Sequence, residues 1–216
     1  MEDQNAFITQ SLCDDILVNA KEQLDICMSK WCTSYENNSS GGEMRSERGA
    51  DIEKFIRDSI NNIGAKLKKN LKAVRGTGNE KLLRLHYDNK ELIKKHQVDV
   101  HIYLDDKFIA VIECKAYLDH CYYVRACDDF KLFKKFGHDI KCFIFALENS
   151  VDESSKLFTD AITDHVCDEI FYVLDGKRSS SKPIYDSRYK KQINETKLKE
   201  FIDSMIELCT PKTSST

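Results

Sequence analysis

Two short apolar stretches separated by a pair of acidic residues constrain the fold of this chain more than any other feature. The first stretch covers residues 96–104 and the second covers residues 107–115, with Asp105 and Asp106 between them. Both have the length and the apolar character of strands that are covered on both faces of a sheet. We therefore predict a hairpin of two central strands with the acidic pair at its turn.

This hairpin would bring three ionisable side chains close together. Asp99 lies in the first stretch, and Glu113 and Lys115 end the second. Side chains alternate along a strand, so Glu113 and Lys115 are expected on one face, together with Ile109 and Val111. Charged groups at the end of an apolar strand lose hydration and need partners. A divalent metal ion is the natural partner.

The spacing of Glu113 and Lys115 carries little information by itself, because 32% of the residues are charged. An acid two positions before a lysine recurs at Asp105/Lys107 and at several other places. The context of Glu113 and Lys115 is different. Only they end a continuous apolar stretch that comes directly after another apolar stretch, and that earlier stretch carries an acid of its own, Asp99.

These residue types suit magnesium, which prefers hard oxygen ligands in octahedral geometry and keeps several waters. Asp99 and Glu113 would supply two carboxylates, and the main-chain carbonyl of Cys114 would supply a third oxygen. Mg²⁺, with Mn²⁺ as a substitute, would activate a bound water and polarise a phosphate. Lys115 would orient that water or stabilise charge on the phosphorus.

The arrangement of Asp99 followed about fourteen positions later by Glu113-Cys114-Lys115 resembles the PD-(D/E)xK nuclease superfamily. The resemblance covers about a hundred central residues and implies a helix, a mixed sheet with the catalytic hairpin at its centre, a second helix and a further strand over residues 50–147. Val98 replaces the variable proline of the family pattern, which carries no chemistry. In size and architecture the chain most resembles a type II restriction endonuclease.

In this superfamily the helix before the hairpin often presents a glutamate to the metal. Residues 46–56 resemble that helix, with Glu53 as the matching residue. Glu53 could equally be a solvated acid that pairs with Arg57 one helical turn away. Glu47 and Asp51 are the alternatives if the helix is rotated.

The resemblance implies a magnesium-dependent deoxyribonuclease that cuts double-stranded DNA and uses no nucleotide cofactor. Cutting both strands of a short palindrome requires two active sites, which implies a homodimer. A predicted amphipathic helix over residues 5–32 is our candidate for part of the dimer interface. A structure-selective repair nuclease or resolvase, and a non-catalytic DNA-binding module on the same fold, remain alternatives.

The overall charge gives no general attraction to nucleic acid, because the net charge is -3. DNA contacts must therefore come from local basic faces. Lys69, Lys72 and Arg75 lie in a basic run that is either such a strip or an ordinary solvated face. Arg125, about one turn into a predicted helix, is a further candidate.

The remaining pattern predicts an α/β fold, and the resemblance implies a restriction-endonuclease-like core in which helices flank a central mixed sheet, with an added N-terminal helix. We expect this helix and a flexible loop at residues 1–45, packed on a nuclease domain at residues 46–209, and a disordered tail at residues 210–216. The expected helices cover residues 5–32, 50–63, 119–136, 155–166 and 195–208, and the further expected strands cover residues 82–87, 141–147 and 169–174. Alternation of strands and helices after the hairpin predicts parallel crossovers.

Nine cysteines without a Cys-x-x-Cys pair are expected to be free thiols in a reducing compartment. A weaker alternative is a zinc site made by His120, Cys121, Cys127 and His138. The chain has no apolar run of about 20 residues and no basic leader at its start. We therefore expect a soluble cytoplasmic protein without a membrane partner.

Overall fold

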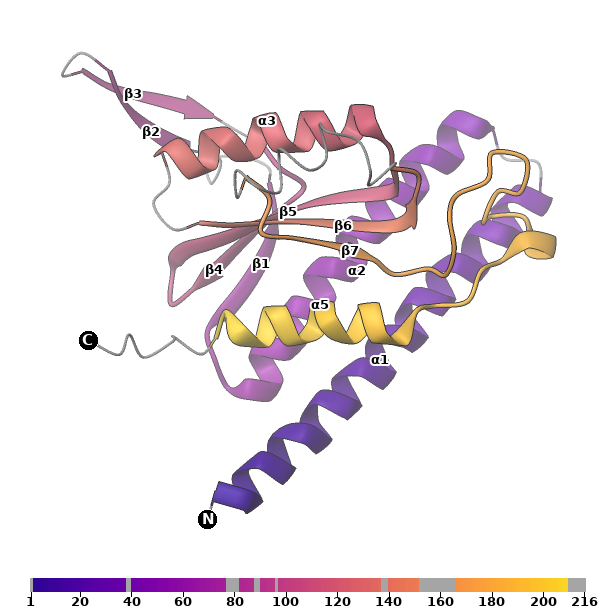
Figure 1. The fold of residues 1–216 in the computed structure, drawn as a ribbon, viewed down its shortest axis with the longest axis horizontal. Coiled ribbons are helices and arrows are strands. Elements are labelled where there is room, and N and C mark those ends of the chain that lie inside the picture. Colours follow the sequence, from indigo (N-terminus) through magenta and orange to yellow (C-terminus); the bar gives the residue numbers. More distant parts are fainter. Residues whose placement is uncertain are drawn as a thin grey trace.

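The computed structural model describes residues 2–37, 40–76, 82–87, 90–95, 97–136, 140–151 and 166–209. They form an α/β fold in which helices flank a mixed five-stranded sheet, as predicted (Figure 1). The elements are α1 (Glu2–Glu36), α2 (Gly41–Leu67), β1 (Leu71–Arg75), β2 (Leu82–Tyr87), β3 (Lys90–Lys95), β4 (Val100–Leu104), β5 (Lys107–Leu118), α3 (His120–Phe136), β6 (Lys141–Asn149), β7 (Glu169–Tyr172), the 3-10 helix η2 (Ser187–Tyr189) and α5 (Glu195–Glu207).

The five strands lie in the order β1-β4-β5-β6-β7, so the predicted hairpin β4–β5 is at the centre of the sheet. β1, β4 and β5 are mutually antiparallel, whereas β6 and β7 continue the sheet in parallel with β5. The predicted hairpin and the parallel crossovers are therefore confirmed. Asp105 and Asp106 form the turn, and both have positive φ angles, of 49° and 62°. Among the described strands, β2 and β3 pair only with each other.

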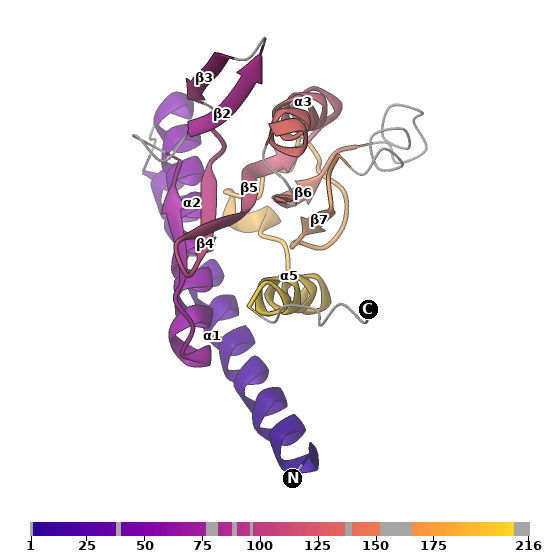
Figure 2. The ribbon, with the colours of Figure 1, turned by 90° about the vertical axis from the view of Figure 1, so that its left-hand side faces the viewer.

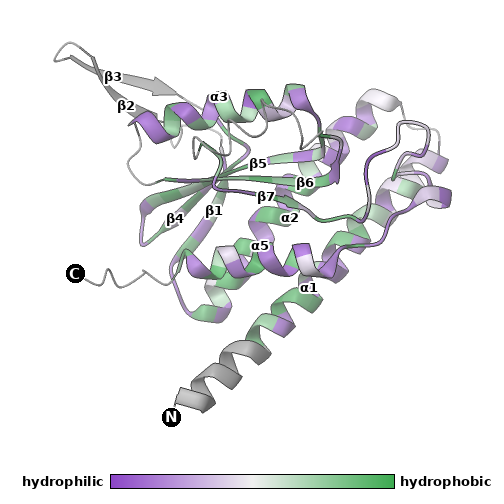
Figure 3. Cartoon of the chain, viewed as in Figure 1, coloured by the Kyte–Doolittle hydropathy of each residue, from purple (hydrophilic) through white to green (hydrophobic). Residues whose placement is uncertain are grey.

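Each face of the sheet has its own apolar layer. α2 and α5 cover one face and α3 covers the other, while α1 packs outside against α2 and α5 (Figures 1 and 2). Figure 3 shows how apolar residues concentrate in the strands between these layers. The α1 residues that contact this core repeat at three- or four-residue spacing, as predicted for an amphipathic helix: Ile16, Ala20, Leu24, Met28 and Trp31. None of the described helices combines the length and the apolarity needed to span a membrane.

A β-bulge changes the predicted alternation along the second strand of the hairpin. The register between β4 and β5 shifts at Ile102/Tyr103, so Tyr103 lies opposite Phe108 while Ile102 lies opposite Ala110. The extra residue turns Ile109 toward the α2 and α5 side, whereas Val111 packs on the α3 side. The predicted common face of these two residues is therefore wrong.

Two strands, β1 and β3, were not predicted. In β1, basic residues surround the apolar positions. Leu71 and Ala73 of β1 are buried, and Lys72 between them is exposed. This edge strand buries only two apolar side chains on its inner face. So short an apolar pattern cannot be recognised within a basic run of the sequence. β4 is also shorter than predicted, since it begins at Val100 and leaves Asp99 at a bend immediately before it.

The two N-terminal helices are longer than predicted. α1 extends to Glu36, and α2 already begins at Gly41, within the segment expected to be a loop. The Ser40 side chain accepts a hydrogen bond from the Glu43 amide, and the Glu43 carboxylate accepts one from the Ser40 amide. This capping box stabilises the start of the helix despite the following glycines. The predicted tail, and all but the last residue of the predicted helix at 155–166, lie outside the described residues.

Candidate active site

The acidic residues of the predicted site meet at one end of the sheet. Glu113 and Lys115 lie in the second half of β5, Asp99 lies just before β4, and Glu53 reaches the same region from α2. Arg75 at the end of β1 pairs with one of them, because its Nε lies 3.1 Å from Oε2 of Glu53. Segments separated by about sixty residues thus supply one cluster of charges.

The ammonium group of Lys115 lies at the centre of this cluster. Its Nζ donates a hydrogen bond to Oε1 of Glu113 and another to the Cys114 carbonyl oxygen at 3.3 Å. The same Nζ is 3.6 Å from Oδ2 of Asp99. The three oxygens predicted as metal ligands therefore converge on one positive charge.

Two main-chain contacts hold Asp99 in place. Its Oδ2 accepts a hydrogen bond of 2.8 Å from the Cys114 amide, and its carbonyl accepts one of 3.1 Å from the Gly76 amide. A Cβ atom on Gly76 would lie 2.0 Å from the Val98 carbonyl oxygen, so this close approach requires glycine. The sequence pattern alone assigned no role to Gly76. No local pattern pointed to Gly76, because the strand before it was itself not recognised in the sequence.

Burial of these charges alters their proton affinities. Burial and the Asp99 carboxylate raise the pKa of Glu113 above its usual value, although the ammonium of Lys115 opposes the change. Burial and the same Asp99 carboxylate raise the pKa of Glu53. Burial alone would lower the pKa of Lys115, but the carboxylates of Glu113 and Asp99 outweigh it and raise that pKa.

The donor set fits a hard divalent cation, because two carboxylates and a carbonyl already surround a single positive charge. Among the described residues, no three His, Cys, Asp or Glu side chains gather closely enough to hold a metal ion. A cation here would therefore depend on Asp99, Glu113 and the main-chain oxygen of Cys114. Water or a phosphate would complete its shell, which is the coordination that Mg²⁺ favours.

The alternative zinc site gains no support. Cys127 is buried in the α3 layer and Cys121 is exposed. His138 lies outside the described residues. The nine cysteines are free thiols, as predicted.

The orientation of α2 distinguishes Glu53 from its two competitors. Glu47 and Asp51 each pair with Lys30 of α1 at 3.0 Å, so they point away from the sheet. Glu53 pairs with Arg57 at 3.6 Å, as the alternative interpretation of the sequence expected, and also contacts Arg75. Glu53 thus has a partner within its own helix and also lies close to Asp99, so the two interpretations of Glu53 do not exclude each other.

The four predicted DNA-binding residues lie in different places. Arg75 is beside the acidic cluster. Lys72 pairs with Asp106 at 3.1 Å, at the turn end of the hairpin, and Lys69 lies near the same end. Arg125 is exposed on α3. The structure brings only Arg75 together with the acids.

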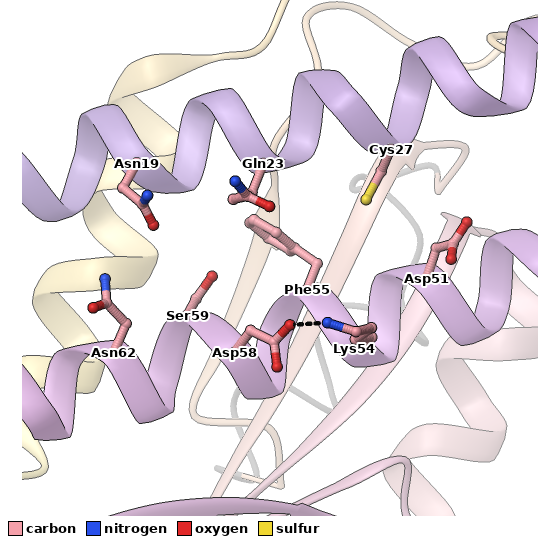
Figure 4. A pocket seen from close by; sticks show the side chains of 9 residues that line it. All are labelled: Asn19, Gln23, Cys27, Asp51, Lys54, Phe55, Asp58, Ser59 and Asn62. Carbon is pink, nitrogen blue, oxygen red and sulfur yellow. Dashed lines mark hydrogen bonds and ion pairs between the residues drawn. The ribbon is translucent and has the colours of Figure 1, made fainter.

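A separate groove of about 280 Å³ lies between α1 and α2 (Figure 4). Amide side chains and three charged groups line it, and two of the charged groups, Lys54 and Asp58, pair with each other. Asp51 at its rim accepts hydrogen bonds from Lys30 and, at 2.8 Å, from Nε1 of Trp31. Because these charges pair with one another, we interpret the groove as a feature of the packing of α1 against α2 and not as a binding site.

The sequence matches no protein-family model. Part of it is similar to the type II restriction enzyme DdeI of Desulfomicrobium norvegicum, with 34% identity over 84 residues that cover 32% of this chain and 35% of that enzyme. The chain thus matches only about a third of the length of this relative. The restriction-endonuclease resemblance noted in the sequence is confirmed by this similarity.

Two solved structures are also similar to the chain. A restriction endonuclease PspGI–substrate DNA complex has 14% identity and a TM-score of 0.43, over 82% of this chain and 70% of that one. A native BbvCI A2B2 tetramer has 10% identity and a TM-score of 0.40, over 95% of this chain and 91% of that one.

Proposed function

We propose that this protein is a magnesium-dependent endonuclease that hydrolyses phosphodiester bonds of double-stranded DNA at specific sequences, as a type II restriction endonuclease. One observation carries the proposal. Asp99, Glu113 and the Cys114 carbonyl direct their oxygens at a single cationic centre beside a buried hairpin. The similarity to a type II restriction enzyme supports the same function.

Asp99 and Glu113 would hold Mg²⁺ together with the Cys114 carbonyl, and Mn²⁺ would substitute for it. The bound metal would supply an activated water and polarise the phosphate to be cut. Once these oxygens have a metal as partner, the Lys115 ammonium is free to orient the attacking water or to stabilise charge on the phosphorus. Glu53, held by Arg75, adds negative charge beside Asp99 and strengthens the attraction for a cation.

Cutting both strands would require two such sites, so we include a homodimer in the proposal. α1 remains the candidate for its interface, because Val18 and Ile26 on its outer side are 56% and 60% exposed. Arg75, with a side chain that is 58% exposed, is the proposed backbone contact nearest the site.

Incubation of the purified protein with plasmid DNA tests the proposal. With Mg²⁺ or Mn²⁺ we expect discrete bands, and we expect no cutting in EDTA. A smear would indicate a nonspecific nuclease, and cutting confined to branched or mismatched DNA would indicate a repair nuclease. Intact DNA with every metal, despite measurable DNA binding, would favour the binding module.

Substitution of the site residues connects any cleavage to this location. Glu113→Ala and Lys115→Ala should abolish cutting while DNA binding stays measurable. Full activity in either variant would remove the proposed site.

A further inference from the structure

A cleft of about 400 Å³ opens directly beside Lys115. Four segments far apart in the sequence line it, namely the beginning of α2, the end of β5 with the first turn of α3, the end of β6, and the loop between β7 and α5. Figure 1 shows that loop passing beside the N-terminal end of α2. Cys114 and Lys115 belong to the lining, so the cleft and the proposed active site share a wall.

Arg48 projects into this cleft from the second turn of α2. Its Nε donates a hydrogen bond of 3.1 Å to the Met44 carbonyl, and its guanidinium carbon lies 4.3 Å from the ring centroid of Tyr185. Burial lowers the pKa of Arg48, which indicates a charge that its surroundings compensate incompletely. Among the described residues no carboxylate forms an ion pair with it, and its terminal N–H groups keep their donor capacity.

Arg178 enters from the opposite side of the cleft and is held equally firmly. Its amide donates a hydrogen bond of 2.8 Å to the Asn149 carbonyl at the end of β6, and its guanidinium lies 3.6 Å from the centroid of Tyr117. Tyr117 packs edge-on against Tyr122 at 5.4 Å, and Nζ of Lys115 is 5.8 Å from the Tyr122 ring. Two aromatic rings thus set the position of Arg178 relative to the proposed catalytic lysine. In the described part of the chain, Arg178 also forms no ion pair with a carboxylate.

The charge balance of the cleft is strongly positive. Arg45 contributes a third guanidinium to the lining. Glu148 is the acid that lines the cleft, and it is already paired with Lys191 at 2.7 Å. The contrast with Arg188 is informative, because its guanidinium pairs with Asp186 at 2.6 Å. The net charge of the protein is -3, so arginines without an acidic partner are not a general feature of its surface. Two such arginines, each held over a tyrosine ring, indicate a binding site for an anion.

We infer that this cleft binds the DNA phosphodiester group next to the one that is cut, between the guanidinium groups of Arg48 and Arg178. This inference rests on the proposed function and assigns it a substrate-binding subsite. A planar guanidinium can donate two parallel hydrogen bonds to one phosphate, and stacking on a ring fixes its plane in advance. Such a contact sets the register of the strand on the protein without reading the bases.

The test measures binding of a fluorescein-labelled DNA duplex at several KCl concentrations, with Ca²⁺ in place of Mg²⁺ to prevent cutting. In the variant R48M/R178M we expect an affinity about tenfold lower and a salt slope reduced by about 0.9 for each phosphate that the protein no longer neutralises. Arg188→Met is the matched control, because its charge is already neutralised, and should keep the wild-type affinity and slope. R48K/R178K keeps both charges and should retain the slope while its affinity falls. Melting curves show which variants are folded.

The outcomes separate this inference from the function on which it rests. Wild-type affinity and slope in R48M/R178M would overturn the inference even if the protein cuts DNA. Reduced affinity with an unchanged slope would also overturn it, because the cleft would then hold an uncharged group such as a base. A protein that shows the expected decreases in affinity and slope but never cuts DNA would overturn the proposed function and leave the subsite in place.

Discussion

The two ends of the β4–β5 hairpin carry the same chemical groups in opposite surroundings. At the turn end, Lys72 pairs with Asp106 at 3.1 Å, and the two side chains are 56% and 80% exposed. At the other end, Lys115 contacts Asp99 and Glu113, and the three side chains are 21%, 25% and 14% exposed. Acid–lysine spacing alone does not distinguish them, since Asp105 and Lys107 at the turn repeat the pattern of Glu113 and Lys115.

This difference shows that burial, and not sequence spacing, determines the electrostatic properties of an acid–lysine pair. Water screens the exposed pair, which contributes about 0–1 kcal/mol to stability. At the buried end, burial and then the repulsion from the Asp99 carboxylate raise the pKa of Glu113. A divalent cation relieves that repulsion, so only the buried end is suited to bind one.

The largest expected difference between the two ends concerns DNA cleavage. Lys115→Met should lower the rate of plasmid cleavage by about 10²–10³-fold, because the phosphorus loses its nearest positive side chain. Lys107→Met removes the same group at the exposed turn end and should stay within about twofold of wild type. Equal decreases in the two variants, measured as initial rates with Mg²⁺, would contradict the assignment of the site.

The next prediction concerns the support of the buried end. A methyl group at Gly76 meets the Val98 carbonyl, so Gly76→Ala should displace Asp99, lower the affinity for Mn²⁺ and destabilise the fold by about 1–3 kcal/mol. Urea unfolding and calorimetric Mn²⁺ titration measure both effects. Gly42→Ala, where the added atom meets nothing within 4 Å, is the control and should leave both values unchanged or slightly improved. Normal Mn²⁺ affinity in Gly76→Ala would show that Asp99 needs no such support.

A smaller effect is expected on the pH dependence of stability without metal. Because the pKa of Glu113 is raised above 4.5, the folded state binds its proton more tightly than the unfolded chain does. The stability from that proton is present below 4.5 and is lost as the pH rises through the raised pKa. In EDTA at neutral pH, Glu113→Gln should therefore raise Tm, by about 2–4 °C for each kcal/mol gained. The difference should shrink as the pH is lowered toward that pKa.

The exposed carboxylate of Asp106 provides the comparison for this measurement. Asp106→Asn should change Tm little at any of these pH values. A lower Tm for Glu113→Gln at neutral pH would mean that its pairing with Lys115 outweighs burial and the repulsion from Asp99.

The smallest predicted effect lies in the turn itself. Asp106 has a φ angle of 62°, which glycine adopts without strain. Asp106→Gly should therefore raise the free energy of unfolding by less than about 1 kcal/mol, despite the loss of its pair with Lys72. Cleavage should be unchanged, and a clear loss of activity would show that the turn end contributes to the site.

The sequence predicted those parts of the molecule that local patterns encode. The apolar runs of β5 and β6, the periodicity of α3 and α5, and the acids at Asp99 and Glu113 can all be read over short distances. The edge strand β1 could not, because only Leu71 and Ala73 mark its inner face among lysines. The bulge beside Ile109 also left no local signal, since it depends on the pairing of two strands.

The site itself was only partly predictable, because its geometry comes from tertiary contacts. The sequence could not show that Lys115 contacts all three predicted ligand oxygens, or that Gly76 fixes Asp99. The cleft was hidden for a similar reason. Arg48 and Arg178 meet only because a loop after β7 returns to the start of α2.

The most direct test of the proposed site is the position of Mn²⁺ in crystals of the protein bound to DNA, located by its anomalous scattering. We predict a Mn²⁺ ion coordinated by the carboxylates of Asp99 and Glu113 and by the Cys114 carbonyl, with the Lys115 ammonium displaced from that carbonyl. A Mn²⁺ ion bound elsewhere, with Lys115 still hydrogen-bonded to Glu113 and Cys114, would contradict the account.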